Sequence, residues 1–135
     1  MSSKRKGNNA VLSIGKIDRE IYKCITEDIT TEEVVITENQ MQHMKARHPD
    51  AYDKILNNIQ EAIQFPDYII RDKHAYTGLV IKKLKIDDGF LQIVLRICTS
   101  EDAQGYRNSI ISCWEISEKR LQNYLRNKEI LYNRE

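Results

Sequence analysis

Apolar residues recur at steps of three and four in two parts of this chain, which is the period of an amphipathic helix. The first stripe follows Asp50 and consists of Tyr52, Ile55, Ile59, Ala62 and Ile63. Proline cannot continue a helix, so Pro66 is expected to end this one. The second stripe consists of Leu121, Tyr124 and Leu125, and it predicts a basic helix over residues 118–127.

Boundary signals predict a further helix ahead of these two. Thr37 is followed three residues later by Gln40, which is the spacing of a capping box at a helix start. Pro49 disfavours helical geometry at the preceding residue, His48. We therefore expect a helix from Thr37 to about His48.

Elsewhere apolar and polar residues alternate with a period of two, which predicts strands. Strand-like segments run over residues 14–25 and 33–37, so a hairpin is expected ahead of the main body. Four more strands are predicted downstream, at residues 68–70, 77–85, 90–98 and 109–116. Asp87, Asp88 and Gly89 form a strong turn signal between two of these strands.

The predicted order is therefore an N-terminal hairpin, two helices, four strands and a C-terminal helix. Helices segregated from a run of adjacent strands indicate the α+β class with an antiparallel sheet. A chain of 135 residues is long enough to bury one core. We expect residues 11–135 to form a single domain and residues 1–10 to form a flexible basic arm.

The composition is that of a soluble globular protein, with 41% hydrophobic and 30% charged residues. A formal net charge of +1 gives no general basic excess that would require a nucleic-acid partner. Charge is nevertheless uneven, because residues 27–38 are acidic and residues 119–134 are basic, so a basic face can exist. No apolar run reaches the length of a membrane helix, and no membrane partner is expected.

Neither the cysteines nor the histidines predict a metal site. The three cysteines are widely spaced without a CxxC pair, which argues against a disulfide scaffold or zinc knuckle and for a reducing cytoplasm. His43 and His48 are five residues apart, or about 140° around an ideal helix. Zinc-binding pairs on a helix use a four-residue step, so these two make a poor chelate. No cofactor is predicted.

Candidate chemistry concentrates on the predicted helix 37–48. It holds two of the three histidines, His43 and His48, with Lys45 and Arg47 between them. His43 and Arg47 are four residues apart and therefore share one helical face. A proton-transfer side chain beside fixed positive charge suits attack on a phosphodiester. The alternative is an ordinary amphipathic helix with a solvated charged face.

Several segments, taken in order, resemble a known family. They are 34–37 (VVIT) followed by His43, Arg47, His48 and Pro49, then 66–70 (PDYII), 108–112 (NSIIS) and 118–128. Together they resemble the barnase–EndoU–colicin–RelE-like (BECR) group of phage-associated nucleases over residues 11–135. The resemblance implies two helices followed by a four-stranded antiparallel sheet, metal-independent ribonuclease activity, and the cytoplasm of a bacterial host.

The resemblance also implies catalytic residues. These are His43, Arg47 and His48 on the helix, with Ser109 and Ser112 on the last strand. Ser112 stands where threonine is more usual, and the hydroxyl is kept. A three-residue separation places Ser109 and Ser112 on opposite faces of a regular strand, so either a bulge intervenes or only one of them belongs to the site.

Metal-independent cleavage of RNA uses the 2′-hydroxyl as an internal nucleophile, and histidine is suited to the proton transfers. We assign an acid–base role to His48, phosphate binding to Arg47, and a second acid–base or positioning role to His43. The serines would donate hydrogen bonds to the phosphate or a base. Structural roles at the helix end and on the helix face are the alternatives for the histidines.

Further basic residues are expected to contact nucleic acid: Lys45, Lys82, Arg96, Lys119 and Arg120. The alternative for those on strands is charge that protects a sheet edge from aggregation. Trp114 is assigned to the core, with a stacking platform for a base as the alternative. His74 is expected to be exposed in a loop without a role.

The leading hypothesis is a toxin-like or phage-encoded endoribonuclease that cleaves RNA, with tRNA as a candidate, to a cyclic phosphate. One rival is a non-catalytic phage head or packaging accessory, and another is a nucleic-acid-binding module without chemistry. The expected partners are RNA and either a phage head protein or an immunity (antitoxin) protein. Fold likeness alone does not choose between these functions.

Overall fold

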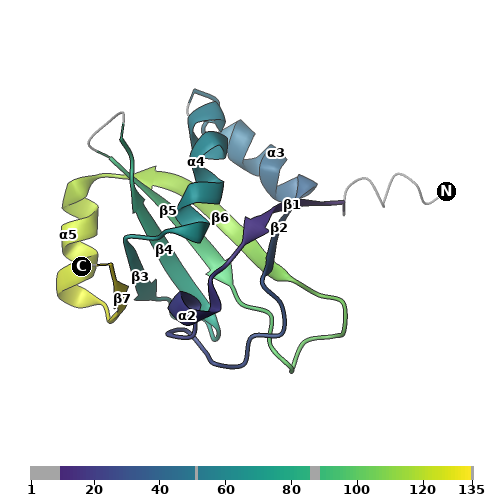
Figure 1. The fold of residues 1–135 in the computed structure, drawn as a ribbon. Helices are drawn as coiled ribbons and strands as arrows, with labels where there is room; N and C mark the ends of the chain where they lie inside the picture. The colour runs from purple at the N-terminus through teal and green to yellow at the C-terminus, as the bar shows by residue number, and fades with distance from the viewer. Residues whose placement is uncertain (1–9, 51, 86–88, 135) are drawn as a thin grey trace.

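The computed structural model describes residues 10–50, 52–85 and 89–134, and it has one sheet with helices on both faces (Figure 1). Within the described residues the sheet has seven strands in the spatial order β1-β2-β6-β5-β4-β3-β7. The strands are β1 (Val11–Lys16), β2 (Glu33–Thr37), β3 (Tyr68–Arg71), β4 (Thr77–Lys83), β5 (Phe90–Arg96), β6 (Asn108–Ile116) and β7 (Ile130–Asn133). The helices are α2 (Arg19–Tyr22), α3 (Glu38–Arg47), α4 (Tyr52–Gln64) and α5 (Glu118–Asn127). The α+β class is confirmed.

Helix α4 packs on one face of the sheet with the stripe that the sequence predicts. Its buried residues are Ile55, Ile59, Ala62 and Ile63. They belong to one core cluster with alternate residues of the strands, among them Val34, Leu91, Ile93 and Leu95. Burying each isoleucine of the stripe contributes about 1.5–3 kcal/mol to the packing of α4 on the sheet. We call this side of the sheet the α4 face.

Helix α5 packs on the opposite side through Leu121. That side has its own cluster of buried residues: Ile70, Leu79, Ile81, Phe90, Ile116 and Leu121. The alternation expected in β4 is confirmed there, because Leu79 and Ile81 belong to the same cluster. Trp114 is half-buried and packs against this cluster, as expected of a core residue.

The expected four-stranded antiparallel sheet is wrong in size and in direction. β2 runs parallel to β6, with Val34 opposite Asn108 and Val35 opposite Ser109, so the sheet is mixed. β7 has no counterpart among the predicted elements, and it pairs with β3 at the far edge. Both differences involve strands far apart in the sequence, whose pairing leaves no mark on local alternation.

The N-terminal hairpin is confirmed only in part. β1 and β2 pair antiparallel, but β1 ends at Lys16, and residues 19–22 form α2 instead of continuing the strand. Asp18 starts this helix, because its side chain accepts a hydrogen bond of 2.9 Å from the N–H of Glu20. The expected basic arm, apart from Ala10, and the turn at Asp87 and Asp88 lie outside the described residues.

Substitution of Tyr22 tests how much its buried hydrogen bond to α4 contributes to stability. It is fully buried, and its hydroxyl donates a hydrogen bond of 2.7 Å to the carbonyl of Ile63 at the end of α4. Replacing Tyr22 with phenylalanine should lower the free energy of unfolding by about 1–3 kcal/mol, because that carbonyl would stay buried without its partner. Urea unfolding followed by circular dichroism measures this loss. The control Tyr106→Phe alters an exposed hydroxyl and should cost less than about 0.5 kcal/mol; equal losses would contradict the expectation.

Candidate active site

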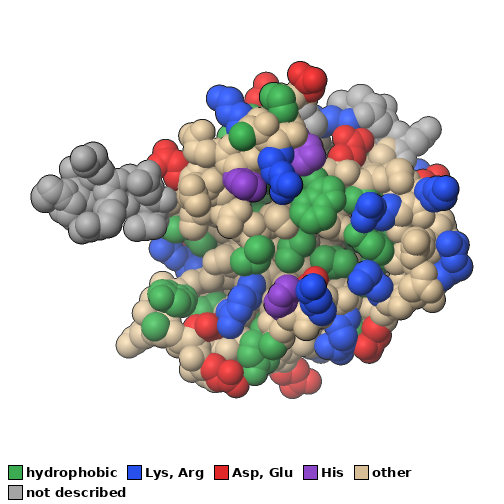
Figure 2. Space-filling model, turned by 180° about the vertical axis from the view of Figure 1, so that it is seen from behind, with side chains coloured by type: hydrophobic (Ala, Val, Ile, Leu, Met, Phe, Trp, Pro, Cys, Tyr) green, Lys and Arg blue, Asp and Glu red, His purple; other side chains and the backbone are tan. Residues whose placement is uncertain are grey.

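The side of the sheet opposite the α4 face is only partly covered by α5, and the rest is open. Ile111 of β6 is 43% exposed there. Four neighbours on β5 and β6 are half-buried: Val94, Arg96, Ser109 and Ser112. We call these five residues the open face. Figure 2 views this side, and it shows histidine, lysine and arginine side chains around an apolar strip.

A β-bulge interrupts β6 in the middle of the open face. In the pairing of β5 with β6, Val94 lies opposite Ser112, whereas the next residue, Leu95, lies opposite Ile110. Ile111 is therefore an extra residue on β6, and the bulge shifts the alternation of side chains by one position. Of the two alternatives that the sequence leaves open, the bulge is the one present.

The bulge brings both serines to the same side of the sheet as Arg96. Ser109 lies opposite Arg96, and Ser112 lies opposite Val94. Arg96 and Val94 are two residues apart on β5 and share a face, and directly opposite residues of paired strands also share a face. A guanidinium group and two hydroxyls therefore lie on one uncovered surface.

The guanidinium of Arg96 is held by groups outside the open face. Its Nη1 donates hydrogen bonds of 2.9 Å to Asp102 Oδ2 and 3.0 Å to the carbonyl of Ile97. Its Cζ lies 5.9 Å from the centre of the Tyr76 ring. The hydrogen bond to Asp102 raises the pKa of Arg96 above its already high ordinary value. Both hydrogen bonds use Nη1, so the other guanidinium nitrogens can still donate to an anion.

Two hollows adjoin the open face, and Arg96 and Ile111 line both of them. The first extends past Ser109 toward the loop between β5 and β6. The second extends past Ser112 toward the loop between β3 and β4, where it reaches His74. The open face is thus continuous with space for a ligand larger than one phosphate group.

His74 has a better-defined position than the sequence suggests. Its side chain is 71% exposed, as expected, but its Nδ1 lies 2.8 Å from Asp72 Oδ2. Asp72 also accepts a hydrogen bond of 3.0 Å from the N–H of His74. Burial acts to raise the pKa of Asp72, but the hydrogen bonds from His74 outweigh it and hold that pKa below its ordinary value. An Asx-turn, with Asp two residues before His, is the sequence signal that could have indicated this pair.

Helix α3 carries the other predicted groups and begins as expected. The hydroxyl of Thr37 accepts a hydrogen bond of 3.0 Å from the N–H of Gln40. Met44 is the residue of α3 that is buried in the core, which fixes the rotation of the helix. Beside these internal contacts, α3 touches β2 and β6 of the sheet.

The two α3 histidines differ in their surroundings. His43 is exposed, whereas His48 is half-buried and ends the helix, with its N–H donating 2.9 Å to the carbonyl of Met44. Lys45 and Arg47 are exposed, and the Nζ of Lys45 lies 5.7 Å from the centre of the Tyr52 ring. None of these four basic side chains lines either hollow at the open face.

Lys82 lies on the α4 face and not beside Arg96. Its Nζ donates a hydrogen bond of 2.8 Å to the carbonyl of Phe65 and lies 3.8 Å from Glu61, both at the end of α4. Lys82 is therefore buried on the α4 face, across the sheet from Arg96, because one residue of strand alternation separates the two sides. Lys119 and Arg120 are exposed in the first turn of α5.

The buried side chain of Asn108 holds three chain segments together next to the open face. The sequence did not indicate this role. Asn108 is fully buried, and its Oδ1 accepts a hydrogen bond of 2.7 Å from the N–H of Cys98. Its Nδ2 donates hydrogen bonds of 2.9 Å to the carbonyls of Thr31 and Glu33. One amide thus joins the start of β6 to the end of β5 and to the segment leading into β2, directly before Ser109.

The cysteines are poor candidates for nucleophiles. All three are free, and burial raises the pKa of Cys24 to about 11 and that of Cys113 further. Both thiols therefore stay protonated near neutral pH.

Among the described residues, no group of three or more His, Cys, Asp or Glu is arranged to hold a metal ion. Nor does any helix described here have the length and apolar character needed to cross a membrane.

The sheet is packed by α4 on one face and partly covered by α5 on the other, where arginine and hydroxyl side chains lie on the open part. In the comparison with family models, residues 11–133 match the family described as phage-Barnase-EndoU-ColicinE5/D-RelE like nuclease2, and the chain belongs to this family. The family expected from the sequence is thereby confirmed. Comparisons with curated proteins and with solved structures found no match.

Proposed function

We propose that this chain is a metal-independent endoribonuclease that cleaves RNA at the open face. The observation that supports this most directly is the bulge in β6, which leaves Ser109, Ser112 and Arg96 on one side of the sheet. A guanidinium group binds phosphate oxygens through paired, planar hydrogen bonds, and hydroxyls add further donors. These are the groups required to bind one phosphodiester of an RNA strand.

The nucleophile is supplied by the substrate. A base removes the proton from the 2′-hydroxyl, and the 2′-oxygen forms a bond to phosphorus. The bond from phosphorus to the 5′-oxygen breaks, and an acid donates a proton to that oxygen. The products are a 2′,3′-cyclic phosphate and a 5′-hydroxyl, so this step needs neither water nor a cofactor. Acid–base groups of this kind contribute about 10²–10⁴-fold to the rate.

We assign the acid–base role to His48, which is half-buried at the end of α3. His43 takes the second acid–base or positioning role. Arg47 joins Arg96 in neutralising the charge that develops on the phosphate. Ser109 and Ser112 donate hydrogen bonds to the phosphate or to a base.

The remaining exposed residues among the predicted basic set bind flanking phosphates, which positions the strand without reading its sequence. They are Lys45 on α3 with Lys119 and Arg120 on α5. Lys82 is excluded, because its ammonium is buried on the α4 face. We take tRNA as the first substrate to test, since unpaired loops display bases that proteins can read.

The proposal is tested by incubating total tRNA and a single-stranded RNA oligonucleotide with the protein in EDTA. We expect cleavage to fragments ending in 2′,3′-cyclic phosphate, detected by mass spectrometry. A matched 2′-deoxy oligonucleotide should remain intact because it lacks the nucleophile. Replacing Arg96 with glutamine should lower kcat/KM by about 10²-fold, the loss typical of one preorganised donor to the reacting group.

Arg71→Gln is the matched control, because Arg71 on β3 forms an exposed ion pair with Glu129 and is not part of the open face. Its activity should equal that of the unsubstituted protein. Cleavage of the deoxy oligonucleotide at the same rate would rule out the 2′-hydroxyl mechanism. RNA binding without cleavage would instead favour the non-catalytic binding module.

A further inference from the structure

The loop between β5 and β6 carries an exposed aromatic residue that neither the core nor the proposed reaction uses. Tyr106 is 64% exposed, the highest value among the large hydrophobic side chains that the structure describes as exposed. It lies two residues before Asn108 and three before Ser109, so it is close in sequence to the open face. An aromatic ring exposed at the margin of the open face offers a large apolar surface, with a polar hydroxyl at its tip, to a ligand.

The first part of this loop is held firmly. Asp102 accepts hydrogen bonds of 2.8 Å from the N–H of Thr99 and 2.9 Å from Arg96. Ser100 donates from its hydroxyl to Asp28 at 2.6 Å, and its N–H donates to the same carboxylate at 3.2 Å. Two carboxylates thus anchor the loop on both sides, which lowers the conformational entropy that a ligand would otherwise have to remove on binding.

The tip of the loop turns at Gly105, whose φ of +96° lies in the region that favours glycine. Nothing lies within 4 Å of the position where a Cβ would project from Gly105, so the tip stands clear of the protein. The N–H of Tyr106 donates a hydrogen bond of 3.3 Å back to the carbonyl of Ala103. This turn directs Tyr106 out of the loop and next to the open face.

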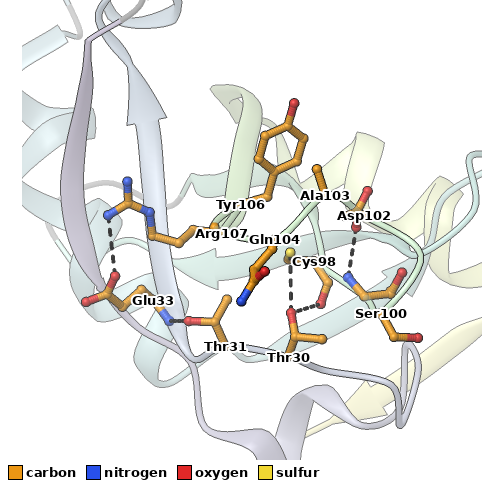
Figure 3. A pocket seen from close by; sticks show the side chains of 12 residues that line it. Thr30, Thr31, Glu33, Cys98, Ser100, Asp102, Ala103, Gln104, Tyr106 and Arg107 are labelled. Atoms are coloured by element: carbon orange, nitrogen blue, oxygen red, sulfur yellow. Dashed lines mark hydrogen bonds and ion pairs between the residues drawn. The ribbon is translucent and has the colours of Figure 1, made fainter.

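Tyr106 separates two hollows of different character. On one side it shares the first hollow with Arg96, Ser109 and Ile111 of the open face. On the other side it borders a polar hollow that Thr30, Thr31, Gln104 and other residues line. In Figure 3 the side chain of Gln104 points into this polar hollow, while the ring of Tyr106 stands at its rim.

We propose that Tyr106 is a substrate-binding residue on which one unstacked base of a single-stranded RNA stacks, with its edge directed toward Gln104. This inference rests on the proposed function. Aromatic rings bind bases of any identity through their faces, and an amide side chain offers both donors and acceptors to a base edge. The base neighbouring the phosphate at Arg96 and Ser109 is the one within reach, since both residues share a hollow with Tyr106.

The test measures binding to a single-stranded RNA oligonucleotide in which every 2′-hydroxyl is methylated, so that the 2′-oxygen cannot act as the nucleophile. Tyr106→Ala should raise Kd by about 5- to 150-fold, the range for one base–aromatic stack, while Tyr106→Phe should stay within about twofold. Phe65→Ala is the matched control, because Phe65 is 54% exposed just after α4 and lines neither of the two hollows that Tyr106 borders. Fluorescence anisotropy gives the Kd values.

An abasic scan of the same oligonucleotide locates the base. Removing one particular base should weaken binding to the unsubstituted protein by the same factor as Tyr106→Ala, and removing it should have no further effect on Tyr106→Ala. Equal Kd values for Tyr106→Ala and the unsubstituted protein, or additive losses at every abasic position, would overturn the inference. Because the assay requires no cleavage, it can fail while the RNA is still cut, and it can succeed where no cleavage is found.

Discussion

Replacing His48 with alanine is expected to lower kcat for RNA cleavage by about 10²–10⁴-fold while leaving KM nearly unchanged. The reason is that an acid–base group acts in the transition state and adds little to the binding of the ground state. The position of His48 is well fixed, as an acid–base group requires. His48 is half-buried at the end of α3, and its N–H donates a hydrogen bond to the carbonyl of the buried residue Met44. Steady-state kinetics on one RNA oligonucleotide in EDTA measures the loss.

Two readouts separate an acid–base role for His48 from a structural one. The pH–rate profile of the unsubstituted protein should have two limbs, and the alanine variant should lose one of them. Imidazole added to the buffer should restore part of the rate of His48→Ala, because it can enter the space left by the ring and transfer the proton. Gln42→Ala, on the exposed side of the same helix, should behave as the unsubstituted protein. Full activity of His48→Ala with an unaltered profile would remove His48 from the mechanism.

Replacing Asn108 with aspartate is expected to have the largest effect on stability. The substitution keeps the shape of the side chain but removes the two N–H donors that reach the carbonyls of Thr31 and Glu33. It also buries a negative charge among carbonyl oxygens. An uncompensated buried charge costs about 3–5 kcal/mol, a large part of the roughly 5–15 kcal/mol by which a domain is stable. Urea unfolding at pH 7 gives the difference.

The pH dependence of the Asn108→Asp variant has a definite sign. Burial beside carbonyls raises the folded-state pKa of the introduced carboxyl above its unfolded value. The variant is therefore least stable above the folded-state pKa, and it regains stability relative to the unsubstituted protein as the pH falls and the carboxyl is protonated. Asn57→Asp on the exposed side of α4 should cost less than about 0.5 kcal/mol. A loss for Asn108→Asp that is equally small would contradict the role given to its amide.

The position of Asn108 links stability to the proposed chemistry. Its amide bonds to the end of β5, to the segment before β2 and to the start of β6, and Ser109 follows directly. The same β5 end carries Arg96, and the loop that leaves it carries Tyr106. A single buried side chain therefore joins the end of β5, which carries Arg96, to the start of β6, which carries Ser109.

Local rules were sufficient for several parts of this protein. The apolar stripe of α4, the Thr37 cap of α3 and the alternation of β4 depend on neighbours within a few residues, and the structure has all three. Asp18 shows the limit of such rules. The residues around Asp18 alternate like a strand, yet a four-residue helix begins there. The side chain of Asp18 accepts a hydrogen bond from the N–H of Glu20, which in a continued strand would bond to a neighbouring strand instead.

The sequence by itself determined the α+β class, the three longer helices and the family, because periodicity, capping residues and ordered motifs are written in adjacent positions. Only the tertiary structure decided which side each functional residue occupies. The extra residue Ile111 turned Ser112 to the side of Arg96, while regular alternation left Lys82 on the other side. Strand register is set by hydrogen bonds to a partner strand distant in the chain, and a change of one residue reverses every side chain beyond it.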